Sequence, residues 1–513
     1  MTFFEILLAL LLTAILLLQV SRRLALPYPA MLAAAGVVLA LFPGLPSIGL
    51  DPRTALPLFI APALVDAAFD FPAGEVRKLW KPLFALAVVA VLLTVGAVTV
   101  LGTLVAGLPL YAAMTLGAIV APPDAAAASP VLRSLRMPQR SAAVLMGESL
   151  LNDATALLLF GAAVGAQLHG GFERSDLLRL GLAAPGGVAL GIGVAMIYRR
   201  IVHLVSGTLG GSLLEFVAAF AVWIIADRLG LSAVLCTVAF AMTMARDAGL
   251  RQSPRDRVHS YAVWELVVFL LNVLAFLLMG LQARSILTGM SVTRLHQTLS
   301  VAGLVVVCVI GVRLAWVLAY NRLGRRFVAL RGDFEPANLR QGVLVGWCGM
   351  RGLITLATAF SLPASFPQRD LIVLTAFSVV LVTLVVQGAT LAPLARLLRL
   401  DTDDGPDREL AEARMKLAEA GLDALRNESG IEADHLKHVL RIEQAGPSDP
   451  RWLDELSVKR ALSLMALGGQ RKELQALRAK AAIDPETFSV LQQELDLHEL
   501  ALIGEDERRI DEN

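Results

Sequence analysis

Long apolar stretches separated by short polar loops recur along the first 400 residues of the chain. A helix that crosses the roughly 30 Å hydrocarbon core of a bilayer needs about 17 to 25 apolar residues. Thirteen stretches reach or approach that length, at residues 3–20, 28–44, 54–71, 82–106, 110–132, 141–167, 177–201, 212–228, 231–246, 261–283, 299–321, 340–361 and 371–395. The pattern therefore predicts an all-α polytopic membrane protein with about 13 transmembrane helices.

The pattern changes after Leu400, where the polar segment DTDDGPD leads into amphipathic helices such as RELAEARMKLAEAGLDALRNE. We therefore divide the chain into a transmembrane domain, residues 1–400, and a soluble helical tail, residues 401–513. The tail has a net charge of −11, and the transmembrane domain has one of +12. The tail is either a solvated helical domain or a regulatory or dimerising module that docks on basic cytoplasmic loops. We favour the first, because charge complementarity alone does not specify a contact.

Composition agrees with a membrane protein. The chain is 56% hydrophobic, with a mean hydropathy of +0.66, which is above the usual level of soluble proteins. Its three cysteines lie in apolar stretches without a CxxC spacing, so neither a disulfide framework nor a thiolate metal site is indicated. The N-terminal apolar run lacks a basic leading region and a small-residue cleavage site. We interpret it as a retained first transmembrane helix rather than a signal peptide.

Lysine and arginine predict the orientation of the helices, because short cytoplasmic loops carry an excess of these residues. Residues 1–400 contain 30 of them, and an outside N-terminus places 21 on the inside, seven on the outside, and Arg313 and Arg351 within spans. We therefore expect a multi-pass protein of the cell (inner) membrane with an outside N-terminus and a cytoplasmic C-terminus.

Few charged side chains remain within the predicted spans, where each costs at least about 2.5 to 3.5 kcal/mol and marks a candidate site. They are Asp66, Asp124, Glu148, Asp153, Arg313 and Arg351, with Glu215 and Glu265 nearer to span ends. The two end residues can reach an interface, and Asp124 can simply cap a helix. No such structural explanation applies to Asp153, because the stretch that follows it is apolar and offers no path to water.

The segment GESLLNDATALLLF, residues 147–160, contains Asp153. Residues four apart share a helix face, so Ser149 and Asp153 lie on one face, and Glu148 and Asn152 lie on the next. A hydroxyl one turn from a carboxylate is a hard-oxygen site that suits a monovalent cation. Glu148 points elsewhere, and we expect Arg313 to pair with it, because an unpaired buried charge is too costly.

Two spans carry helix-breaking residues. In YAAMTLGAIVAPPDAAAASPVL the consecutive prolines Pro122 and Pro123 predict a break between Val120 and Asp124. In QGVLVGWCGMRGLITLATAFSLP three glycines surround Arg351. Transporters bind ions at such broken helices. The two spans are the fifth and the twelfth, which is the spacing expected if spans one to six and eight to thirteen form inverted repeats around the seventh.

These motifs resemble those of the sodium/proton exchanger and NhaP-like branch of the monovalent cation:proton antiporters. The resemblance covers essentially all of residues 1–400 and rests on GESLLND, GMRGLITLA, LFIAPALVDAAFDF, NVLAFLLMGLQ, ADRLGLSAVL and IGVRLAWV. It implies that the two broken helices cross and that Asp153 alternately holds a cation and a proton. It also implies a homodimer, a role in pH homeostasis, and transported Na⁺ (or K⁺ or Li⁺) and H⁺ without any cofactor.

The resemblance assigns roles to the other polar residues as well. Asp66, Ser149 and Asp124 would help to bind the cation or proton beside Asp153. Asn152 would support the helix crossing. A structural ion pair would join Glu148 to Arg313, and Arg351 would compensate helix-end charge at the crossing.

Two positions depart from the family pattern. The fifth span has Pro123-Asp124-Ala125 where the family commonly has Thr-Asp-Pro, and Asp66 replaces a longer glutamate. Both changes alter coordination distances, so sodium, potassium and mixed selectivity remain open.

The predicted mechanism is competition at one carboxylate, because a carboxylate removed from water binds a proton more tightly. The resemblance implies a one-for-one, electroneutral exchange, since Asn152 stands where electrogenic relatives carry a second aspartate. A cation channel is the alternative from another class, although a channel needs no single titrating carboxylate at a helix break. An intramembrane enzyme is not indicated, because the spans offer scarcely any histidine and no HExxH motif. Nothing indicates a nucleic-acid partner.

Overall fold

The computed structural model describes residues 3–24, 28–40, 52–124, 139–171, 174–205, 208–251, 254–327, 338–398, 405–445, 450–480, 482 and 484–502. Throughout these ranges the regular structure is helical, without a strand. The chain forms two compact units, Met1–Thr402 and Asp403–Asn513. The structure therefore agrees with the predicted all-α class.

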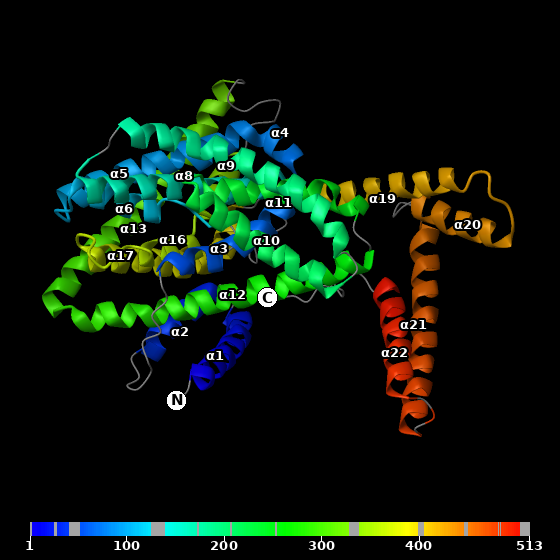
Figure 1. Cartoon of the computed structure of the whole chain (residues 1–513). Helices are drawn as coiled ribbons and strands as arrows, with labels where there is room; N and C mark the ends of the chain where they lie inside the picture. Colours follow the sequence, from blue (N-terminus) through cyan, green and yellow to red (C-terminus); the bar gives the residue numbers. More distant parts are fainter. Residues whose placement is uncertain are drawn as a thin grey trace. The chain divides into compact units, whose positions relative to one another are not determined.

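Helices of the first unit are labelled in Figure 1. They are α1 (Phe3–Leu24), α2 (Tyr28–Ala40), α3 (Pro52–Phe69), α4 (Ala73–Phe84), η1 (Ala85–Ala90), α5 (Val91–Leu104), α6 (Leu110–Val120), α8 (Gln139–His169), α9 (Arg174–Ile201), η2 (Val202–Leu204), α10 (Leu209–Arg228), α11 (Ala233–Arg251), α12 (Pro254–Gly289), α13 (Val292–Arg326), α15 (Leu339–Trp347), α16 (Leu353–Phe360), α17 (Arg369–Val382), η3 (Thr383–Gln387) and α18 (Gly388–Leu398).

Seven helical stretches among the described residues are long and apolar enough to cross a membrane. They are Ala73–Leu104, Ser141–Leu168, Leu180–Ile201, Gly210–Arg228, Arg257–Leu278, Val292–Arg326 and Arg369–Leu398. Four shorter apolar helices, Leu11–Ser21, Leu56–Phe69, Leu110–Val120 and Ala233–Arg246, fall within other predicted spans. Parts of the second and fifth predicted spans, residues 41–44 and 125–132, lie outside the described residues. The count of 13 stays a prediction.

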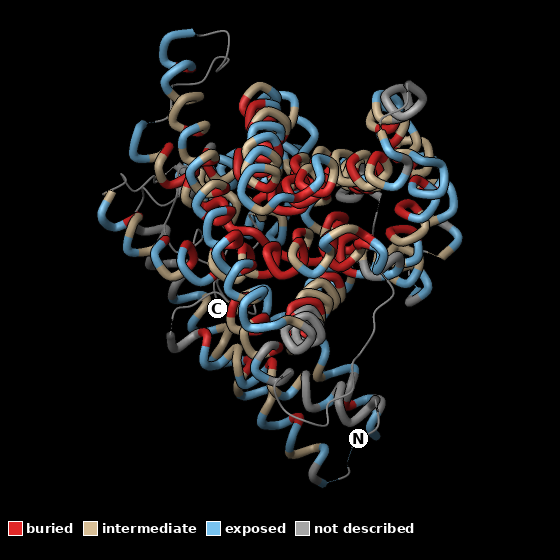
Figure 2. Tube along the Cα trace, turned by 90° about the vertical axis from the view of Figure 1, so that its left-hand side faces the viewer, coloured by how far each residue is buried: buried red, intermediate tan, exposed pale blue. Residues whose placement is uncertain are grey.

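Buried residues gather in the middle of the first unit (Figure 2), and helices from both halves of the chain pack on one another, as α2 does on α12 and α3 on α11. Close backbone approach is possible there because small residues face one another. A Cβ added to Gly36 of α2 would lie 2.8 Å from the Cα of Gly280 in α12. These two helices therefore pack through glycine at their crossing.

Two π-helical turns interrupt the spans that begin with α4 and α17. Turn η1 joins α4 to α5, and η3 joins α17 to α18. The Trp316 ring nitrogen of α13 donates to the Ala85 carbonyl oxygen at the start of η1, at 2.8 Å. Turns of this kind are rare in proteins, and those that occur often lie at functional sites.

The second unit consists of α19 (Gly405–Ala424), α20 (Ile431–Ala445), α21 (Pro450–Ala479) and α22 (Pro485–Leu502). Helices α19 and α20 pack together, and so do α21 and α22 (Figure 1). Leu467, Leu474 and Phe488 are buried between the last two. Arg471 pairs with Asp496 at 2.5 Å and also with Glu499, and these hydrogen bonds raise the pKa of Arg471. Whether this unit is cytoplasmic, regulatory or dimerising stays a prediction.

Candidate functional site

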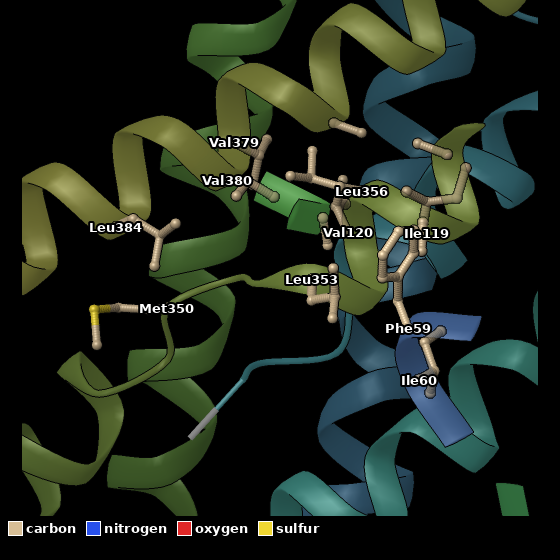
Figure 3. Close-up of a cluster of buried hydrophobic side chains, with 14 of the residues drawn as sticks. Phe59, Ile60, Ile119, Val120, Met350, Leu353, Leu356, Val379, Val380 and Leu384 are labelled. Carbon is tan, nitrogen blue, oxygen red and sulfur yellow. The ribbon is translucent and has the colours of Figure 1, made fainter. Parts of the chain in front are cut away.

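Two stretches of non-helical backbone meet inside the first unit. The first follows α6, which ends at Val120, where the two prolines predict a break. The second runs from Cys348 to Gly352, between α15 and α16. The Asp124 amide donates to the Met350 carbonyl oxygen at 2.6 Å and joins the two breaks. Figure 3 shows the second break between Met350 and Leu353, with Val120 near Leu353 and Leu356.

Arg351 closes the end of α6. Its side chain is 1% exposed. It donates to the carbonyl oxygens of Val120 at 3.1 Å and Ala121 at 3.5 Å, and also to that of Gly349. The last carbonyls of a helix lack intrahelical partners and carry partial negative charge. Arg351 therefore supplies both the hydrogen-bond donors and the positive charge that this helix end requires.

Asp124 lies against the opposite kind of helix end. Gly352 is the N-cap residue of α16, and a Cβ added to it would lie 2.6 Å from Asp124 Cγ and even closer to a carboxylate oxygen. The N-terminus of a helix carries partial positive charge and favours an anion. Each break thus places a charge of the stabilising sign at a helix end of the other.

The middle of α8 faces these breaks. Asp153 is 4% exposed and Asn152 is fully buried. The Asn152 side-chain amide donates to the Pro123 carbonyl oxygen in the first break at 2.8 Å. Asp153 is close enough to Asp124 for the two carboxylates to repel each other. Ser149, one turn before Asp153, is half-buried. The structure therefore brings Asn152, Asp153 and Asp124 to one place.

Glu148 lies beside Arg313 of α13. The two guanidinium nitrogens Nη1 and Nη2 donate to the carboxylate oxygens Oε1 and Oε2 at 2.5 and 3.0 Å, and Nη2 also donates to the Val345 carbonyl oxygen at 3.3 Å. Both side chains are buried. Gly349 packs directly on the Arg313 side chain and leaves no room for a Cβ. This bidentate pair links α8 and α13 to the second broken helix.

Asp66 lies on α3, which packs on both α16 and α8. Its carboxylate is half-buried on α3, and the charges that act on it are those of Asp70 and Glu265. Glu215 accepts hydrogen bonds from Ser260 Oγ at 2.6 Å and Trp264 Nε1 at 3.1 Å. These bonds tie α10 to α12. Glu265 of α12 thus acts on Asp66 of α3 through its charge, and Glu215 of α10 binds polar groups of α12.

Sequence reasoning missed one polar contact at the breaks. The Thr383 hydroxyl oxygen accepts from the Arg351 amide at 3.1 Å, and this side chain is fully buried. A single threonine among valines and leucines is an ordinary feature of an apolar helix. The sequence therefore held no signal for this contact.

The chain is similar to known proteins over most of its length. The family model "Sodium/hydrogen exchanger, transmembrane" matches residues 7–397. The chain is 29% identical over 528 residues to the uncharacterised Na⁺/H⁺ exchanger YjcE of Escherichia coli, covering 94% of this chain and 95% of that one. It is 27% identical over 505 residues to a sodium, potassium, lithium and rubidium/H⁺ antiporter of Bacillus pumilus, covering 93% and 74%.

Among solved structures, the fold is similar to that of the sodium proton antiporter MjNhaP1 from Methanocaldococcus jannaschii at pH 8. The TM-score is 0.61 at 20% sequence identity, and the match covers 77% of this chain and 99% of that one.

Proposed function

The chain belongs to the sodium/hydrogen exchanger family of transmembrane monovalent cation:proton antiporters, and from this premise we propose that it exchanges one Na⁺ for one H⁺ by alternating access. The members of this family are transporters rather than enzymes. The observation that supports the proposal most strongly is the buried Asp153 carboxylate beside two broken helices whose end charges are already compensated.

Asp153 is the residue that binds either ion. A carboxylate taken out of water favours its neutral, protonated form, and repulsion from Asp124 acts in the same direction. A cation therefore has to displace the proton, so the two ions compete for one place. The Ser149 hydroxyl and the Asp124 carboxylate are hard oxygen groups that supplement the site.

Neighbouring groups keep this site in position without carrying an exchangeable charge. Asn152 holds the first break through Pro123, and its amide does not titrate in the physiological range. The guanidinium of Arg313 neutralises Glu148. One titrating carboxylate per transport cycle is consistent with electroneutral exchange, because one positive charge then moves in each direction.

Helix packing supports the inverted repeats that alternating access requires. In the predicted repeat, α11 corresponds to α2, and α12 corresponds to α3. Helix α2 packs on α12, and α11 packs on α3. In the same way, α5 packs on α6 while α13 packs on α15, and α6 packs on α8 while α15 packs on α18. Each of these three contacts thus has a partner contact made by the corresponding helices of the other half.

Potassium/proton exchange is the second candidate function. The first break offers Pro123 where the family commonly has threonine, and the shorter Asp66 is subject to the charges of two other acids, Asp70 and Glu265. Both features change the oxygen ligands that discriminate between cations. The Bacillus pumilus relative, which is named for four alkali cations, favours this candidate as well.

Four further properties belong to the same proposal. The protein lies in the cell membrane with its N-terminus outside, and it contributes to pH homeostasis. Two copies form a homodimer. The acidic tail is cytoplasmic, where the basic loops of the transmembrane domain are expected.

Purified protein in liposomes tests the proposal. An inward gradient of Na⁺, K⁺ or Li⁺ should move protons outward, and the Asp153→Asn variant should lose this movement because asparagine cannot release a proton. Asp370→Asn is the matched control, because Asp370 is exposed at the start of α17. Continued cation-driven proton movement in Asp153→Asn would overturn the assignment. A strong dependence of the rate on an imposed membrane potential would contradict electroneutrality.

A further inference from the structure

Helix α17 changes its hydrogen-bond pattern at Thr383. From Thr383 to Gln387 the chain forms the π-helical turn η3, and α18 follows. This turn lies within the candidate span Arg369–Leu398. A π turn needs a local reason, because its hydrogen bonding departs from the regular helix at a cost. Thr383 is the first residue of the turn.

The Thr383 hydroxyl both accepts and donates hydrogen bonds. Its oxygen accepts from the Arg351 amide at 3.1 Å. Its hydrogen is directed to the carbonyl oxygens of Val379 at 2.8 Å and Val380 at 3.2 Å, in the preceding turn of α17. The hydroxyl is therefore held by its own helix, and its oxygen is presented to the second break.

The Arg351 amide depends on this contact. It lies in the non-helical segment between α15 and α16, in a fully buried part of the molecule. A buried backbone donor without a partner is strongly unfavourable. The other end of the same residue closes α6 through Val120 and Ala121. A shift of the Arg351 backbone would therefore move its guanidinium relative to the carbonyl oxygens at the end of α6.

The first break is held in a comparable way. Asn152 of α8 donates to the Pro123 carbonyl oxygen there. Helix α8 packs on α6, and α17 packs on α16. In each half of the chain, a polar side chain from the helix that follows the break in sequence holds one backbone group of that break.

We propose that Thr383 is a positioning residue for ion exchange, the counterpart of Asn152 in the second half of the chain. Its hydroxyl fixes the Arg351 backbone, so that the guanidinium reaches the end of α6 beside Asp153 and Asp124. Thr383 does not touch the transported ion. This inference rests on the proposed function for its effect on transport, but not for its effect on the break itself.

A matched control separates this role from the common bond of a threonine to its own helix. Thr94 of α5 is also buried, and its hydroxyl donates to the Ala90 carbonyl oxygen four residues earlier. Thr94→Val removes such a bond but no hydrogen bond to either break. Thr383→Val removes the same bond together with the acceptor for Arg351. Thr383→Ser keeps both.

The experiment compares the three variants with the wild type as full-length protein in liposomes. Thr383→Val should lower the maximal exchange rate about fivefold or more, the fold-change that corresponds to one unsatisfied buried donor. It should also displace the pH profile of exchange, because Arg351 helps to set the charge balance around Asp153. Thr383→Ser should restore both quantities, and Thr94→Val should leave both unchanged.

Deuterium uptake supplies a readout that does not depend on transport. The peptide covering residues 348–352 should take up deuterium faster in Thr383→Val than in the wild type, and no faster in Thr94→Val. If Thr383→Val does not assemble, Thr383→Ala removes the same hydroxyl and is measured in its place.

Two results would overturn the proposal. One is a hydroxyl-deleted variant with wild-type rate, pH profile and deuterium uptake. The other is a Thr383→Ser variant as impaired as Thr383→Val, since the methyl group rather than the hydroxyl would then matter. The proposed function fails separately, if wild-type vesicles show no cation-driven proton movement. Faster deuterium uptake in Thr383→Val would still support the positioning role in that case.

Discussion

The two breaks reach the same crossing by different chemistry. In the first, Pro122 and Pro123 end α6 because proline removes amide donors and disfavours a helical residue before it. In the second, Gly349 and Gly352 leave room for the side chains of Arg313 and Asp124, which pack where a Cβ would otherwise stand. The first break is thus determined by local sequence, and the second by what packs against it.

The breaks also carry opposite charges. Asp124 of the first lies at the N-terminus of α16, and Arg351 of the second lies at the C-terminus of α6. Each charge therefore stabilises a helix end that belongs to the other break. This difference shows that each broken helix relies on the other for the charge at one of its helix ends. Substitutions in one break should therefore change the stability of the other.

The largest effect is expected from the ion pair that supports the second break. Arg313→Met leaves the Glu148 carboxylate buried and unpaired, and this should destabilise the protein by about 3–5 kcal/mol. The thermal unfolding of detergent-solubilised protein measures the loss. The double variant Glu148→Gln/Arg313→Met removes both charges and should recover most of the stability. A double variant as unstable as Arg313→Met would show that Arg313 acts mainly through its packing on Gly349.

The next effect concerns the opposite charges themselves. Arg351→Gln removes charge-assisted hydrogen bonds to Val120 and Ala121, and we expect a loss of about 1.5–3 kcal/mol. If each charge supports the same crossing, Asp124→Asn should cost less in the Arg351→Gln background than in the wild type. A double-mutant cycle on unfolding should then give a coupling of about 0.5–3 kcal/mol. Strict additivity would mean that the two breaks are independent.

Gly352 of the second break can be compared with a helix glycine that has open space around it. Gly352→Ala forces Asp124 away from the N-terminus of α16, and such overpacking should cost about 1–3 kcal/mol and lower the exchange rate. Gly303→Ala in α13 is the control, because nothing lies within 4 Å of its added Cβ. Equal unfolding midpoints for the two variants would show that Asp124 relaxes without loss.

The sequence could predict the features that have local causes. Apolar runs marked the long helices, two prolines marked the end of α6 at Val120, and the cost of isolated charges placed Arg313 opposite Glu148. Features with tertiary causes could not be predicted. The contact from Thr383 to Arg351 depends on how α17 packs, and the charges around Asp66 depend on α12 approaching α3. Helical periodicity says which residues share a face, but not which face another helix covers.

The smallest effect is expected at the hydrogen bond that holds the first break. Asn152→Ala removes the donor to the Pro123 carbonyl oxygen, and a typical hydrogen bond contributes about 1 kcal/mol net. The loss should be small because the prolines already restrict this backbone, whereas the glycines of the second break do not. The thermal unfolding midpoint should therefore fall less in Asn152→Ala than in Thr383→Val. The opposite order would mean that the first break, despite its prolines, depends more on its neighbour than the second does.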